Sequence, residues 1–106
     1  MDTTTAFIQS DTDREVVIVV NFGPLSGREA TQAEVDRLAR RLLRTATQVR
    51  VHAVRSHDMG PHSEAIVHQV VVEADARSSQ AGALRSACEA WAADCAAERS
   101  VEPLDV

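Results

Sequence analysis

Apolar positions along the chain predict three β-strands. Residues 15–22 read EVVIVVNF, are almost entirely β-branched and end at Gly23-Pro24, as expected of a strand. Side chains of both parities are apolar, with Val16, Ile18, Val20 and Phe22 on one face and Val17 and Val19 on the other. We therefore expect this strand to be covered on both faces. Residues 48–57 and 64–74 predict two further strands, and the short polar connection with its Gly-Pro pair predicts a β-hairpin.

Apolar side chains at helical spacing predict two helices. The first begins at Thr31, which has capping-box spacing with Glu34, and ends near Ala46. The second begins at Ser78 or Ser79 and ends near Ser100. The expected apolar stripes are Val35, Leu38, Leu42 and Ala46 on the first helix, and Leu84, Cys88, Trp91 and Cys95 on the second.

The order strand, helix, strand, strand, helix predicts an α+β fold with both helices on one face of a mainly antiparallel sheet, the ferredoxin-like split βαβ sandwich. A chain of 106 residues accommodates one core. We expect a single domain over residues 15–100. Residues 1–14 are interpreted as an N-terminal tail or edge strand, and residues 101–106 as a C-terminal tail or short final strand.

The second face of the predicted sheet is the first indication of a partner. A ferredoxin-like arrangement leaves one sheet face without helices, yet residues 15–22 and the AIVHQVVV segment of the third strand are apolar on both sides. A second copy of the chain would cover this face, so we expect a homodimer through the open sheet face. The alternative is that the N-terminal segment folds across the sheet.

Composition and charge narrow the class of partner. Hydrophobic residues make up 44% and charged residues 25%, which is typical of a globular domain. The formal net charge of −5 disfavours nucleic acid as a partner. All 11 basic residues are arginine, which we interpret as the codon bias of a GC-rich bacterial genome. The alternative is selection for bidentate binding of carboxylate or phosphate.

The chain shows no sign of a membrane or export segment. No apolar run reaches the roughly 18 residues that a spanning helix needs, and the N-terminus does not have the pattern of a signal peptide. We therefore expect a cytoplasmic protein. Cys88 and Cys95 would lie about 10 Å apart along one helix, too far for a disulfide, and are predicted to be reduced and buried.

The hairpin holds the most informative candidate site. If its turn is centred near Gly60, then His52 lies opposite His68, and Arg50 lies opposite Val70. Arg50, His52 and His68 are the predicted ligand-binding residues, forming a pocket for a small anionic molecule. The alternatives are solvated or interface histidines and a two-histidine metal site. Zinc usually takes three or four protein ligands, so we predict no metal and no cofactor.

Two other segments could bind a partner. Arg37, Arg41 and Arg44 share one face of the first helix at spacings i, i+4 and i+7, with Arg40 beside them, and are the predicted residues for an acidic protein partner. The alternative is a solvated face on which Glu34 and Asp36 neutralise these arginines. The loop 23–28 is interpreted as a strand-to-helix turn, because it lacks the lysine of a phosphate-binding loop.

Three functions follow from these features. The leading hypothesis is a small non-catalytic dimeric domain that binds a small anionic ligand or a protein partner through its sheet face. The second is a small enzyme that uses His52 and His68 as general acid and base. The third is a structural or regulatory interaction protein that docks through its arginine-rich first helix. No catalytic triad is recognisable, so no catalytic residue is assigned.

Overall fold

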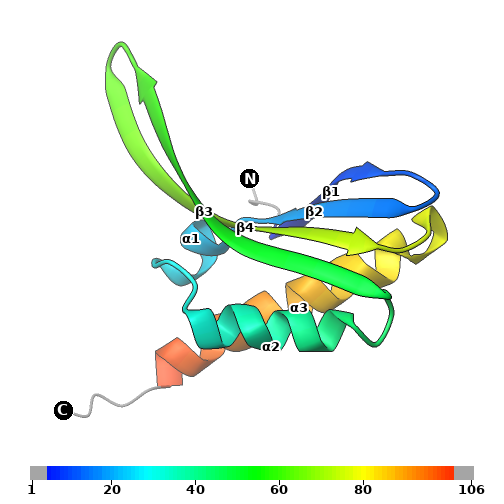
Figure 1. The fold of residues 1–106 in the computed structure, drawn as a ribbon. Helices are drawn as coiled ribbons and strands as arrows, with labels where there is room; N and C mark the ends of the chain where they lie inside the picture. The colour runs from blue at the N-terminus through cyan, green and yellow to red at the C-terminus, as the bar shows by residue number, and fades with distance from the viewer. Residues whose placement is uncertain (1–4, 102–106) are drawn as a thin grey trace.

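The protein is an antiparallel sheet with helices packed on one side (Figure 1). The computed structural model describes residues 5–101. Its elements are β1 (Ala6–Asp11), β2 (Glu15–Val20), α1 (Phe22–Ser26), α2 (Gln32–Leu42), β3 (Gln48–Gly60), β4 (Ser63–Asp75), the 3₁₀ turn η1 (Ser78–Gln80) and α3 (Ala81–Val101). The predicted α+β class, with helices on an antiparallel sheet, is confirmed.

The sheet has the strand order β1-β2-β4-β3, and every neighbouring pair is antiparallel. Strand β4 lies between β2 and β3, so the connection from β2 through α2 to β3 passes over it. The N-terminal segment forms the edge strand β1, with an irregularity in its pairing between Ile8 and Ser10. The final strand considered for residues 101–106 is not formed at Val101, which ends α3; residues 102–106 lie outside the described part.

The hydrophobic core lies between the sheet and the helices. Alternate residues of β2 and β4 are fully buried there, because side chains along a strand alternate between its two sides. The Phe22 and Trp91 rings are the largest buried groups, with centroids 5.2 Å apart. Both predicted helix stripes are buried: Val35, Leu38, Leu42 and Ala46, and Leu84, Cys88, Trp91 and Cys95.

Glu34 joins three segments beneath the sheet. Thr31 and Glu34 form the predicted capping box at the start of α2. Two guanidinium nitrogens of Arg28 donate to the Glu34 carboxylate, each at 2.7 Å, and Trp91 Nε1 donates to the Glu34 carbonyl at 2.9 Å. The hydrogen bonds from Arg28 hold the pKa of Glu34 well below its usual range, at about 2.

The first predicted strand and first predicted helix both end earlier than expected. Phe22 belongs to the short helix α1, which ends at Gly27 in the left-handed conformation at φ 77°; glycine favours such a helix end. Helix α2 ends at Leu42 rather than near Ala46, and the Ala46 amide still donates to the Leu42 carbonyl in the following turn.

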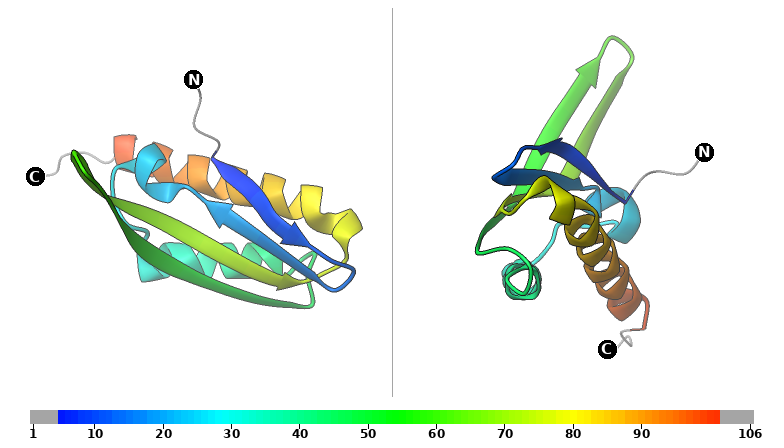
Figure 2. Two further views of the ribbon diagram at one scale, coloured as in Figure 1. Left: turned by 90° about the horizontal axis from the view of Figure 1, so that it is seen from above. Right: turned by 90° about the vertical axis from the view of Figure 1, so that its right-hand side faces the viewer.

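The β3–β4 hairpin extends well beyond the helices. Its outer part, residues 56–67, is called the arm, and it begins just after the pair Arg55–His68. The arm bends away from the helices toward the uncovered side of the sheet (Figures 1 and 2). The radius of gyration is 14.5 Å, compared with about 13 Å for a compact domain of this length.

Candidate functional site

The side of the sheet opposite the helices is called the open face. The strand registers place Phe7, Val19 and Val71 side by side across three strands of it. Phe7 is 39% exposed although it is a large apolar side chain. The other apolar members are Val17 on β2 and, toward and into the arm, Val54 and Val67.

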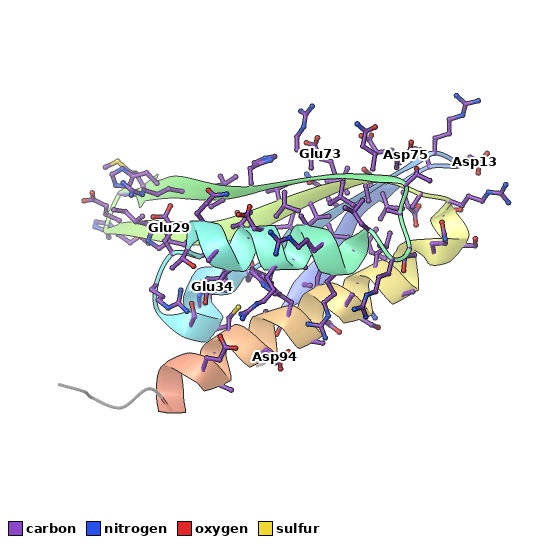
Figure 3. The ribbon with its side chains drawn as sticks, turned by 60° about the horizontal axis from the view of Figure 1, so that its bottom comes forward. Asp13, Glu29, Glu34, Glu73, Asp75 and Asp94 are labelled. Atoms are coloured by element: carbon purple, nitrogen blue, oxygen red, sulfur yellow. The ribbon has the colours of Figure 1, made fainter. Side chains whose placement is uncertain are left out.

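Polar side chains lie beside this apolar centre. Arg50 on β3 is paired across the strands with Glu73, and their charged groups are 3.8 Å apart. Figure 3 shows Glu73 on the open side of the sheet, whereas Glu34 and Asp94 lie among the helices. Where the face meets the arm, Gln69 donates a hydrogen bond to Asn21 Oδ1 at 2.8 Å. The open face thus combines an apolar centre with a polar margin.

The predicted pairing of His52 with His68 is wrong. His52 lies opposite Val71, and His68 lies opposite Arg55. The strands continue to Gly60 and Ser63, so the turn holds only Pro61 and His62. This moves the register by three residues, and an odd shift exchanges the two faces of a strand. The predicted three-residue pocket is therefore not assembled.

The predicted ligand residues divide between the two sides of the sheet. Arg50 and His52 are both on the open face, whereas His68 is on the helix side. There the His68 backbone packs closely on Gly23, where an added Cβ would lie 3.1 Å from His68 N and O. Within the arm, His57 Nε2 forms a hydrogen bond of 2.7 Å with Glu64 Oε2. Among the residues described, no three His, Cys, Asp or Glu side chains are placed to hold a metal ion.

The arginines of the first predicted helix form one stripe around a surface hollow of about 370 Å³, lined by Arg37, Arg40, Arg41 and Arg44. Arg37 donates to both carboxylate oxygens of Glu98 on α3, at 3.1 and 3.3 Å. Arg41 donates to Asp94 at 3.5 Å. The neutralising partners predicted within α2 are wrong, because the Glu34 side chain binds Arg28 and that of Asp36 accepts from Gln32.

The remaining candidates have structural roles. The predicted loop 23–28 is mostly the short helix α1, in which Ser26 Oγ donates to the Phe22 carbonyl at 2.8 Å, and Arg28 lies over the Phe22 ring. Cys88 and Cys95 are free and buried, as predicted. Burial raises the pKa of these thiols to about 12 and about 11, so neither is an activated nucleophile.

A groove of about 710 Å³ follows the outer edge of β3, beside α2. Val35 and Ala39 of α2 and Val49 and Val51 of β3 contribute apolar lining, and charged residues at the end of the sheet line the rest. Sequence reasoning missed this groove because edge position depends on strand order, which the periodicity of one strand does not reveal.

Comparisons with known proteins add no relative. No protein-family model matches the chain, and neither the curated proteins nor the solved structures contain a match. Within the part of the chain that the structure describes, no helix is long and apolar enough to cross a membrane.

Proposed function

We propose that the protein is a non-catalytic interaction domain that acts as a homodimer, with the open faces of two copies packed together. The apolar open face is the observation that supports this proposal most directly. Phe7, Val17 and Val71 lie there on three strands with no helix over them. Val19, between Phe7 and Val71, is only 6% exposed, but Phe7 is 39% exposed. Uncovered apolar surface is typical of a protein interface, and a two-fold dimer buries the same patch on both copies.

The arm gives this proposal a second line of support. A two-stranded hairpin is marginally stable on its own in water, and most side chains of the arm are exposed, including Met59 and Ile66 on the side away from the open face. The arm bends toward the open side of the sheet (Figure 1), where the second copy would lie. Its open-face residues, including Val67, continue the apolar surface, so the partner would also support the arm.

The polar margin fits a dimer interface with an apolar centre. Interfaces commonly have a desolvated core and a polar rim. Arg50 and His52 would lie in this rim, and a small anionic ligand would bind there. We also propose a ferredoxin-like arrangement for β2 to α3, with β1 taking the edge position beside β2. The alternative of His52 and His68 acting together in catalysis has no geometric support, because they lie on opposite sides of the sheet.

The test is the mass of the protein in solution, measured by light scattering during size-exclusion chromatography over a range of concentrations. We expect the wild type to be a dimer. Val71→Glu places a charge in the centre of the open face and should give a monomer with an unchanged circular dichroism spectrum. Leu43→Glu is the matched control, because Leu43 is 51% exposed and lies just beyond α2, on the helix side.

Two results would contradict the proposal. A wild-type protein that stays monomeric at the highest concentration would remove the dimer itself. A dimer that persists in Val71→Glu but dissociates in Leu43→Glu would place the interface on the helices.

A further inference from the structure

The arginine stripe of Arg37, Arg40, Arg41 and Arg44 concentrates positive charge in an acidic protein. The whole chain has 11 basic residues and a formal net charge of −5, yet four guanidinium groups line one hollow. Glu98 and Asp94 neutralise only two of these charges. The stripe and its two carboxylates together therefore keep a net positive charge.

Two of the four arginines are held in place by α3. Arg37 contacts Glu98 and also donates to Cys95 Sγ at 3.5 Å, and Arg41 contacts Asp94. These contacts limit the freedom of both side chains, so less conformational entropy is lost when a ligand binds. Arg40 and Arg44 form no ion pair with the described residues, and their guanidinium groups are available to a ligand.

We propose that the arginine stripe binds a ligand that carries two or more linked phosphoryl groups. A guanidinium group donates two parallel hydrogen bonds to phosphate oxygens. The four guanidinium groups come from α2 and the turn that follows it. Together they offer more hydrogen-bond donors than the oxygens of one phosphate can accept, so a linked oligophosphate can contact more of them at once. A hollow of about 370 Å³ lies in the size range of small-molecule sites.

The lining of the hollow sets the ligand class. The four arginines are its only lining residues among those described, so the apolar surface of the hollow is limited to their methylene groups, and it contains no aromatic side chain on which a nucleobase could stack. Recognition therefore depends on the charged chain of the ligand. Single-stranded nucleic acid is disfavoured, because its binding sites usually include aromatic side chains on which bases stack.

The experiment is isothermal titration calorimetry of the purified chain with inorganic tripolyphosphate, pyrophosphate and orthophosphate at low ionic strength. We expect affinity to fall in that order, and to fall again when salt is added. Arg40→Glu and Arg44→Glu should each weaken tripolyphosphate binding by about tenfold or more. Arg40→Lys keeps the charge but removes the guanidinium fork, and should give an intermediate loss.

The matched control is Arg14→Glu, which makes the same charge change in the exposed connection between β1 and β2. When both variants are compared at about 0.15 M salt, it should leave tripolyphosphate affinity within about twofold of wild type, because the Debye length is then only about 8 Å and more distant exposed charges are largely screened. An equal loss in Arg14→Glu and Arg40→Glu would mean that only the net charge of the protein matters, and would overturn the proposal. Equal affinity for all three anions would also overturn the proposal. In a parallel titration with a glutamate-rich peptide, binding of the peptide but not of tripolyphosphate would overturn it as well.

This site is independent of the proposed dimer. The stripe lies on α2 and the turn after it, on the helix side of the sheet, whereas the proposed interface lies on the open face. Val71→Glu should therefore bind tripolyphosphate as the wild type does. The two proposals can fail separately, since light scattering tests the dimer and calorimetry tests oligophosphate binding.

Discussion

The two ends of the β3–β4 hairpin show what strand pairing achieves with and without a core. Both ends have the same continuous antiparallel register. In the inner end, Val70 and Val72 of β4 are fully buried between the sheet and the helices. In the arm, Ile66 of the same strand is 55% exposed. The difference teaches that pairing fixes the shape of the hairpin, while burial against other elements decides how strongly each part is held.

The largest expected difference comes from one substitution made at two isoleucines. Ile18 of β2 is fully buried, and Ile66 of the arm is more than half exposed, although both are on the helix side of the sheet. Ile18→Ala should lower the free energy of unfolding by about 2–5 kcal/mol. Ile66→Ala should change it by about 0.5 kcal/mol or less. Chemical denaturation measures both values, and a cost for Ile66→Ala similar to that for Ile18→Ala would show that the arm is packed.

A comparable contrast is expected between two ion pairs. Glu34 has only 12% of its side chain exposed and is bound by Arg28, whereas Glu64 has 59% of its side chain exposed beside His57 in the arm. Glu34→Gln should cost roughly 1–3 kcal/mol, since it removes the negative charge to which Arg28 donates two hydrogen bonds. Glu64→Gln should cost at most about 1 kcal/mol. Equal losses of unfolding free energy, measured by urea denaturation, would contradict the idea that Glu34 holds the loop of Arg28 and helix α3 to α2.

The contribution of Glu34 should disappear in acid. Its pKa is lowered from 4.5 to about 2 in the folded protein, so the unfolded state binds a proton first as the pH falls. The stabilisation is then fully present above pH 4.5 and is lost progressively as the pH falls toward 2. The difference in unfolding free energy between wild type and Glu34→Gln should shrink through this window. A constant difference from pH 6 to pH 2.5 would rule out an ion-pair origin.

The smallest effect separates the ends of the hairpin without any mutation. Backbone amides of arm residues 56–67 should exchange hydrogen faster than those of the inner residues 70–75 of β4, because locally exposed segments open more easily. Repeating the hydrogen-exchange measurement at several protein concentrations tests the dimer as well. If the open faces pair, exchange in the arm should slow as the protein is concentrated, and exchange in residues 70–75 should change less. Equal exchange at all concentrations would mean that the hairpin opens as one unit.

Local sequence patterns were sufficient for the elements and the helix-facing core. The β-branched run at residues 15–22, the capping-box spacing of Thr31 and Glu34, and the stripe through Trp91 each express a preference of neighbouring residues. These preferences match the structure at β2, α2 and α3. Details that depend on distant parts of the chain were not predictable in this way. Arg28 binds Glu34 from a loop, a contact that follows no helical or strand period.

The hairpin register shows where such reasoning ends. Gly60 and Pro61 indicate a turn equally well whether the centre is at Gly60 or between Pro61 and His62, and no β-branched residue between Val54 and Ile66 marks where either strand ends. The two-residue turn that forms keeps Met59 and Gly60 in β3. A shift in the turn of one or two positions thus decided which histidines share a face, which is why the fold was predicted better than the candidate site.

The unbroken register of the hairpin has a consequence for changes in its length. Residues of the arm contact few other elements, so pairs of residues can be lost or gained there without disturbing the core. Removing one residue from each strand at the base of the arm would reverse the side of the sheet to which every arm side chain belongs, exchanging the sides on which Ile66 and Val67 lie. Removing two residues from each strand would leave every side chain on its original side of the sheet and would only bring the tip of the arm closer to the rest of the sheet. Insertions and deletions should therefore be tolerated in the arm in steps of four residues, two on each strand.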